Sequence, residues 1–156
     1  MAATSFAQSS FKKNDIYFEV GGNGLFASVN YERQLTKEPG LGARFGIGFY
    51  VEDAFYLTMP IGLNYLFPLR NQRSFIEAGV GVTWAHYNGT VFQKDDLEKG
   101  NSFVNFVPSF GFRRHTKHSV MWRINATPVF NKYATTPWLG FSIGTRCSNM
   151  PLLPLT

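Results

Sequence analysis

The chain has 156 residues, which suits a single domain, and its aromatic content of 17% is too high for an intrinsically disordered protein. It holds no run of about 20 apolar residues that could form a membrane-spanning helix, and its one cysteine, Cys147, excludes an intrachain disulfide. The net charge of +5 comes from short basic segments rather than a basic stripe with interleaved aromatic residues, which argues against nucleic-acid binding.

Apolar residues alternate with small or polar residues almost continuously between residues 15 and 147, which is the pattern of β-strands. In LGARFGIGFYVE, residues 41–52, every second residue is apolar, and the residues between are mostly glycine with one arginine. The same alternation predicts strands at residues 55–67, 74–84, 104–113, 120–128 and 139–146.

The first segment, residues 15–35, has two interpretations. The apolar face holds Ile16, Phe18 and Val20 before GGNG (21–24), and Leu25, Ala27, Val29 and Tyr31 after it. The phase therefore changes at GGNG, either at a hairpin turn or at a glycine bulge within one strand. A hairpin gives eight strands and a bulge seven. Bacterial outer-membrane barrels have even strand numbers, so we predict an eight-stranded antiparallel up-and-down transmembrane β-barrel over residues 14–147.

The connections between strands differ in length and charge. Short basic turns are expected at residues 36–40, 68–73 and 115–118, and the neighbouring residues Arg113, Arg114 and Lys117 are interpreted as solvated. The connection at 88–102 is long and polar, and it is a candidate surface loop for a protein partner through Asp95, Asp96 and Glu98. Short turns at one end and longer loops at the other are typical of outer-membrane barrels.

The distribution of glycine between the two faces of the strands indicates which face is expected to lie inside the barrel. The face opposite the apolar one is rich in glycine, which a water-exposed strand does not need but a narrow eight-stranded lumen does. The large residues on this face are two acids and two bases, and they should pair as one net-neutral ionic layer that plugs the lumen: Glu19, Arg44, Glu77 and Arg123. The alternative is that these four are exposed charges on a soluble sheet.

Aromatic residues on the apolar face lie near predicted strand ends. Aromatic girdles are expected where a membrane barrel meets the two interfaces, and Tyr31, Phe67, Trp84 and Trp122 are the candidates. The alternative is that they are ordinary core aromatics.

Both ends of the chain are expected to lie outside the barrel. Ser5-Phe6-Ala7 followed by Gln8 has the form of a signal-peptidase site, so residues 1–13 are interpreted as a signal-peptide remnant and an N-terminal tail. The alternative is an ordinary polar N-terminal tail. Residues 148–156 are interpreted as a C-terminal tail.

Seven segments together resemble one family: FEVGGNGLFASVNYER (18–33), ARFGIGF (43–49), MPIGLNYLF (59–67), IEAGVGVTW (76–84), FRR (112–114), RINATPVF (123–130) and PWLGFSIGTR (137–146). They resemble small outer-membrane β-barrel proteins of the OmpA/OmpX type, and most of all the uncharacterised versions found in the Bacteroidetes. The resemblance implies a Gram-negative outer membrane, contact with its lipid, insertion by the barrel assembly machinery and no catalytic residues. Such barrels usually end at an aromatic residue on the last strand, whereas this chain continues through CSNMPLLPLT.

No catalytic, cofactor-binding or metal-binding residue is predicted. A lipid A hydrolase would need a histidine beside a serine on the lipid-facing wall, and the adjacent pair His118-Ser119 should point to opposite faces of a strand. His115 and His118 could bracket a metal, but a third ligand is not evident. The predicted function is therefore non-enzymatic: a porin-like barrel with a structural or surface-interaction role, or a subunit of an outer-membrane complex. A soluble lipocalin-like carrier of an apolar ligand and a membrane-embedded lipid A hydrolase are the alternatives.

Overall fold

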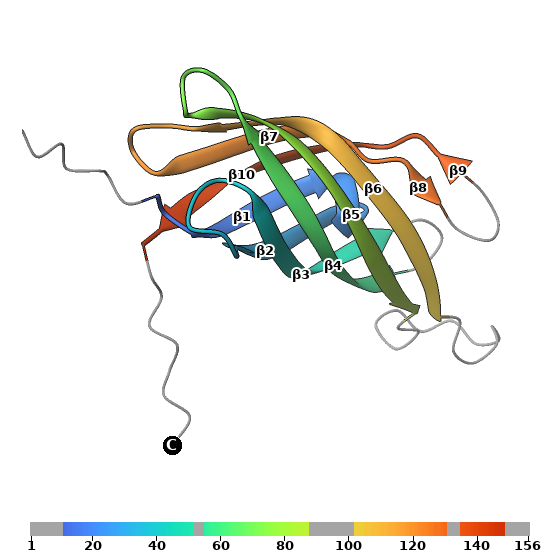
Figure 1. Cartoon of the computed structure of the whole chain (residues 1–156). Helices are drawn as coiled ribbons and strands as arrows, with labels where there is room; N and C mark the ends of the chain where they lie inside the picture. The colour runs from blue at the N-terminus through green and yellow to red at the C-terminus, as the bar shows by residue number, and fades with distance from the viewer. Residues whose placement is uncertain (1–10, 52–54, 88–101, 131–134, 149–156) are drawn as a thin grey trace, which may run out of the picture.

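The computed structural model describes residues 11–51, 55–87, 102–130 and 135–148 and forms a closed antiparallel β-barrel (Figure 1). Eight long strands make the wall: β1 (Asn14–Gly21), β2 (Ala27–Gln34), β3 (Leu41–Val51), β4 (Phe55–Pro68), β5 (Ser74–Tyr87), β6 (Ser102–His115), β7 (Val120–Ala126) and β10 (Leu139–Cys147). Two short strands, β8 (Val129–Phe130) and β9 (Thr135–Thr136), continue the sheet beyond β6 and β7.

The topology is up-and-down. Each long strand pairs with the long strands before and after it in the chain, and β5 pairs with β6. The barrel closes between β1 and β10, from Asn14 opposite Cys147 to Gly21 opposite Gly140. The prediction of an eight-stranded antiparallel barrel is confirmed. Within the described residues, no helix is long and apolar enough to cross a membrane.

The hairpin between β1 and β2 folds its turn into the barrel. The turn is the short 3-10 helix η1 (Gly22–Gly24), and Gly21, Gly22 and Leu25 have positive φ angles of 71°, 66° and 71°. The carbonyl oxygen of Asn23 accepts a hydrogen bond from Thr83 Oγ1 on β5 at 2.5 Å. η1 also contacts β3, β4 and β10, so the turn reaches the opposite wall.

The expected outward direction of Leu25 is wrong. It was placed on the outward apolar face, but its side chain is only 6% exposed and packs inside against Val107 and Val129. The reason is the left-handed backbone on both sides of η1, which turns the chain inward and breaks the alternation. The indole of Trp138 extends this small core and donates a hydrogen bond to the carbonyl oxygen of Leu25 at 2.9 Å.

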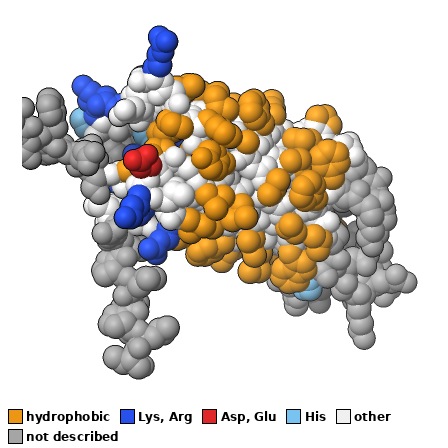
Figure 2. Space-filling view, in the orientation of Figure 1, with side chains coloured by type: hydrophobic (Ala, Val, Ile, Leu, Met, Phe, Trp, Pro, Cys, Tyr) orange, Lys and Arg blue, Asp and Glu red, His pale blue; other side chains and the backbone are white. Residues whose placement is uncertain are grey.

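The wall is apolar outside and polar inside. Outward side chains such as Phe45, Ile61 and Phe110 are 57%, 61% and 62% exposed, and apolar side chains form a wide band around the face shown in Figure 2. The residues between them in the same strands point inward and are mostly polar or glycine. This follows from the period of two in a β-strand, because one phase of the alternation is bulky and apolar throughout.

The two ends of the barrel differ. At the end that we call the turn end, β1 begins, β10 ends and short turns join β2 to β3, β4 to β5 and β6 to β7. Lys and Arg side chains gather at this end, beside the apolar band (Figure 2). The exposed cations there are Arg33, Lys37, Arg70, Arg73, Arg114 and Lys117. The opposite end, which we call the loop end, holds η1 and the connections from β3 to β4 and from β5 to β6.

Replacement of Gly21 tests the inward turn. Gly21 has φ 71° and ψ −148°, which is accessible almost only to glycine, and an added Cβ would meet the carbonyl oxygen of Leu139. Gly21→Ala should lower the free energy of unfolding by about 1–3 kcal/mol. Urea unfolding in detergent micelles, followed by tryptophan fluorescence, measures this.

Gly40→Ala is the matched control, because Gly40 does not have a positive φ angle and the atoms nearest to an added Cβ belong to the side chain of Thr36. Equal losses of stability in the two variants would contradict the role assigned to the left-handed backbone at Gly21.

Candidate functional site: the charged interior of the barrel

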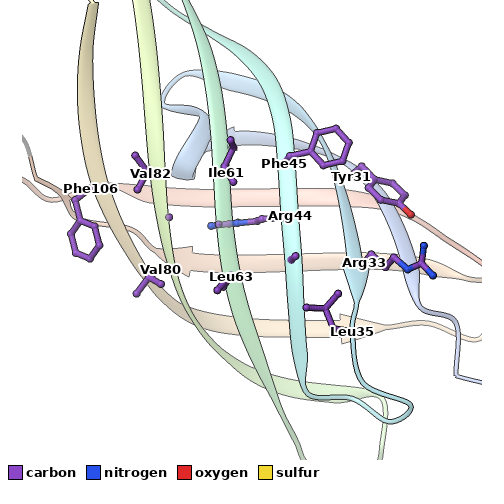
Figure 3. A pocket seen from close by; sticks show the side chains of 13 residues that line it. Tyr31, Arg33, Leu35, Arg44, Phe45, Ile61, Leu63, Val80, Val82 and Phe106 are labelled. Carbon is purple, nitrogen blue, oxygen red and sulfur yellow. The ribbon is translucent and has the colours of Figure 1, made fainter.

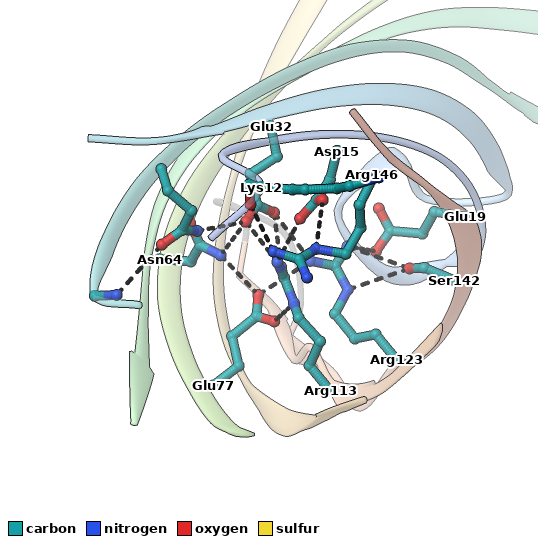
Figure 4. Close-up of polar contacts among 12 residues, drawn as sticks. Lys12, Asp15, Glu19, Glu32, Asn64, Glu77, Arg113, Arg123, Ser142 and Arg146 are labelled. Carbon is teal, nitrogen blue, oxygen red and sulfur yellow. Dashed lines mark hydrogen bonds and ion pairs between the residues drawn. The ribbon is translucent and has the colours of Figure 1, made fainter. Parts of the chain in front are cut away.

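Charged side chains from five strands meet inside the barrel near the turn end. β1 supplies Asp15 and Glu19, β2 supplies Glu32, and β5 supplies Glu77. β6 and β7 supply Arg113 and Arg123. All six are at most 1% exposed, and Figure 4 shows them pointing toward one another across the lumen.

Arg113 is the centre of this network. Its Nη1 and Nη2 lie 2.6 Å and 2.7 Å from the two carboxylate oxygens of Glu32, which is a bidentate pair. Its Nε donates to Glu77 at 2.7 Å, and Nη1 also reaches Asp15 at 3.3 Å. One planar guanidinium therefore joins three strands of the barrel, because its donors form a rigid fork.

Arg123 extends the network toward β1 and β10. Its Nη1 lies 3.0 Å from Glu77 Oε1, and its Nη2 lies 3.4 Å from Glu19 Oε1. Its Nε donates to the hydroxyl of Ser142 at 3.2 Å. The guanidinium also lies 4.5 Å from the ring centroid of Tyr17, so the aromatic ring covers one of its faces.

Neutral amides add further hydrogen bonds to the carboxylates. Asn64 Nδ2 donates to Glu32 Oε1 at 2.9 Å and to Glu77 Oε1 at 3.1 Å, and Gln34 Nε2 donates to Glu32 at 3.0 Å. A buried carboxylate is tolerated when it is both paired with a cation and hydrogen-bonded. Glu32 meets both conditions, since it accepts hydrogen bonds from an arginine, an asparagine and a glutamine.

The four residues expected to form the ionic layer do not all meet. Glu19, Glu77 and Arg123 are fully buried and joined by ion pairs. Arg44 is also buried, at 2% exposed, but its three guanidinium nitrogens have no hydrogen-bond partner among the described residues. Arg44 lies opposite Glu32 in the register, and that carboxylate is occupied by Arg113.

Three members of the network were missed in the sequence: Asp15, Glu32 and Arg113. The interpretation of Arg113 as a solvated turn residue is wrong, since it is 0% exposed, whereas its neighbour Arg114 points outward. The alternation itself carries the signal. Arg113 shares the phase of Asn105 and Ser109, and Glu32 shares the phase of Asn30 and Gln34.

The aromatic residues proposed for the girdles all lie on the outer wall. Phe67 and Trp84 are 49% and 40% exposed, and Tyr31 and Trp122 are half-buried. Tyr31, Phe67 and Trp122 lie near the turn end, where Trp122 packs on Phe112 with ring centroids 5.6 Å apart. Trp84 lies toward the loop end of β5 and stacks on His86, with ring centroids 5.4 Å apart.

The other residues considered for chemistry lie apart. His118 is exposed in the turn between β6 and β7, and the hydroxyl of Ser119 accepts a hydrogen bond from Lys12 at 2.6 Å. His115 is buried, with its ring 4.6 Å from Phe75, so it does not face His118. In the part of the chain that the structure describes, no three His, Cys, Asp or Glu residues gather as metal ligands.

Some of the expectations fall outside the described residues. These are Asp95, Asp96 and Glu98 of the long loop, the signal-peptidase site at residues 5–8, and the tail beyond residue 148.

Removal of the Arg113 charge tests the network. Arg113→Met should lower the free energy of unfolding by about 3–5 kcal/mol, because Glu32 and Glu77 would each lose a buried cation. Arg114→Met is the control, since Arg114 is exposed on the next position of the same strand. Urea unfolding in micelles should separate the two variants, and equal midpoints would contradict the importance of the buried pairing.

Comparison with known proteins gives the fold. No protein-family model matches the chain, and no curated protein sequence matches it. A similar solved structure is the crystal structure of the N-terminal β-barrel domain of Pseudomonas aeruginosa OprF. The match has a TM-score of 0.66 and 8% sequence identity, and it covers 86% of this chain and 96% of that one. The chain thus shares the closed eight-stranded antiparallel barrel of the OprF domain.

Proposed function

We propose that the protein is a small integral β-barrel of a bacterial outer membrane, non-enzymatic, with a structural or surface-interaction role and a lumen closed by its own side chains. The observation that carries the proposal is the polarity of the wall. Phe45, Ile61 and Phe110 are more than half exposed, while Glu32, Arg113 and Arg123 are fully buried. Exposure of this apolar outer wall to water would be energetically unfavourable, whereas contact with lipid acyl chains is favourable for the apolar band.

The ends of the apolar band support a membrane position. Tyr31, Phe67 and Trp122 lie at its turn-end edge, and Trp84 lies toward its loop-end edge. Membrane barrels carry girdles of aromatic residues at both interfaces, and the polar atoms of Tyr31, Trp84 and Trp122 suit the boundary between hydrocarbon and water. We therefore assign these residues to the two girdles.

The lumen is obstructed at more than one height, which supports the proposed plug. The ion-pair network crosses it near the turn end, and η1 reaches across it from the loop end. The small core of Leu25, Val107, Val129 and Trp138 fills further space near the loop end.

The geometry argues against the two alternative functions. A soluble carrier of an apolar ligand needs its apolar face inside, whereas most of the bulky apolar side chains of the described strands are exposed on the outer wall. A lipid A hydrolase of the kind considered needs His118 and Ser119 together on the lipid-facing wall. Both lie in the turn between β6 and β7, and the serine hydroxyl bonds Lys12.

Four further statements about assembly, relatives and partners stay predictions. They are insertion by the barrel assembly machinery, the special likeness to Bacteroidetes proteins, membership of a larger outer-membrane complex, and recognition of a partner by the 88–102 loop with Asp95, Asp96 and Glu98.

Fractionation tests the proposed location. The precursor, expressed in a Gram-negative host, should be recovered in the outer-membrane fraction and should migrate differently on electrophoresis with and without boiling. Both results follow if an apolar-walled barrel folds in the membrane. Recovery as a soluble, detergent-independent protein would contradict the proposal.

Conductance tests the plug. In a planar bilayer the protein should give no large stable conductance, because the ion-pair network and η1 obstruct the lumen. Arg123→Ala, once shown to be folded by its heat-modifiable band, should conduct more, since it removes the cation between Glu19 and Glu77. A large stable conductance from the unaltered protein would exclude a closed lumen.

A further inference from the structure

An apolar groove of about 520 Å³ crosses the outer wall of the barrel from β2 to β6 (Figure 3). Two rows of outward side chains line it, and the strand register defines both rows. One row runs through Tyr31, Phe45, Ile61, Val82 and Phe106. The other runs through Arg33, Ala43, Leu63 and Val80.

The floor of the groove is formed by backbone. The row between the two lining rows runs through Arg44, Gly62 and Gly81, whose positions in the alternation are inward. Ala43 has the smallest side chain of the two lining rows, so the groove is deeper next to Arg33. The result is a long furrow between walls of larger apolar side chains.

The groove is inclined relative to the barrel. Arg33 is next to the last residue of β2, at the turn end, whereas Phe106 lies near the start of β6, toward the loop end. With strands about 4.8 Å apart, five strands span roughly 19 Å. The groove thus begins at one edge of the apolar band and rises into it.

The mouth of the groove carries positive charge. Arg33 is exposed and lines the groove, and none of the ion pairs within the described residues involves it. The other exposed cations lie at the same end, while Glu38 is the one exposed acid in the described part of the chain. A guanidinium binds phosphate oxygens well, since its donors form a planar fork.

We propose that this groove is a binding site for an anionic glycerophospholipid, with its phosphate at Arg33 and one acyl chain between the two rows. The inference rests on the proposed function, because only a barrel in a bilayer presents this wall to lipid. Three features select this ligand. The groove spans five strands, its outward lining side chains are apolar except for Arg33, and this cationic end lies at the edge of the apolar band.

Lipid retention tests the site. The folded protein is reconstituted in vesicles of phosphatidylglycerol and phosphatidylcholine at a ratio of one to three, extracted in mild detergent and analysed by native mass spectrometry. The unaltered protein should retain phosphatidylglycerol several-fold above its share of the vesicles, as a one-to-one adduct. Arg33→Gln should lose this enrichment.

Two further variants complete the design. Arg70→Gln removes an exposed cation of the β4–β5 turn that does not line the groove, so enrichment should persist. Ala43→Phe should fill the groove beside Arg33 and abolish the adduct while every charge remains. Equal enrichment in Arg33→Gln and Arg70→Gln, no enrichment in the unaltered protein, or a lipid-free dimer in place of the lipid adduct would each overturn the inference.

The same samples separate this inference from the proposed function. Each variant is first checked for the heat-modifiable band and for recovery with the vesicles. A barrel that inserts but does not select phosphatidylglycerol refutes the groove and leaves the proposed function standing. A barrel that does not insert refutes both.

Discussion

Two buried arginines hold the interior of this barrel together. Arg113 and Arg123 bind carboxylates from β1, β2 and β5, so strands far apart in the sequence are joined across the lumen rather than along the wall. An eight-stranded barrel encloses little more space than side chains can fill. A carboxylate buried in that space is stabilised when it is both paired with a cation and hydrogen-bonded, as Glu32 is. The inward glycines follow from the same constraint. A Cβ on Gly62, for example, would lie 3.2 Å from Arg44 Nε.

The outer wall of the barrel is apolar, in contrast to the charged interior. In the described residues, most outward positions of the strands carry bulky apolar side chains. The exposed charged side chains lie at the turn end, where all except Glu38 are cationic. The polarity of the side chains therefore varies radially, between lumen and outer wall. The radial variation supports placement in a bilayer.

The strands and the direction of their side chains could be predicted, because apolar and polar residues alternate with a period of two along the sequence. The members of the ion-pair network could not all be predicted, since alternation gives the direction of a side chain but not its height in the barrel. Arg44 has the expected direction, yet Glu32 opposite it is bound by Arg113. Arg113 was misjudged because it adjoins Arg114 and a basic turn. Leu25 was misjudged because alternation assumes extended backbone, and the φ angle of Leu25 is 71°.

The inward turn between β1 and β2 has a consequence for the order of assembly. The wall closes between β1 and β10, the first and last strands, so this seam forms only after the whole chain has been made. η1 contacts β3, β4 and β5 on one side and β10 on the other. The packing of the inward turn is therefore complete only when the seam closes, because its contacts with β10 need that strand in place.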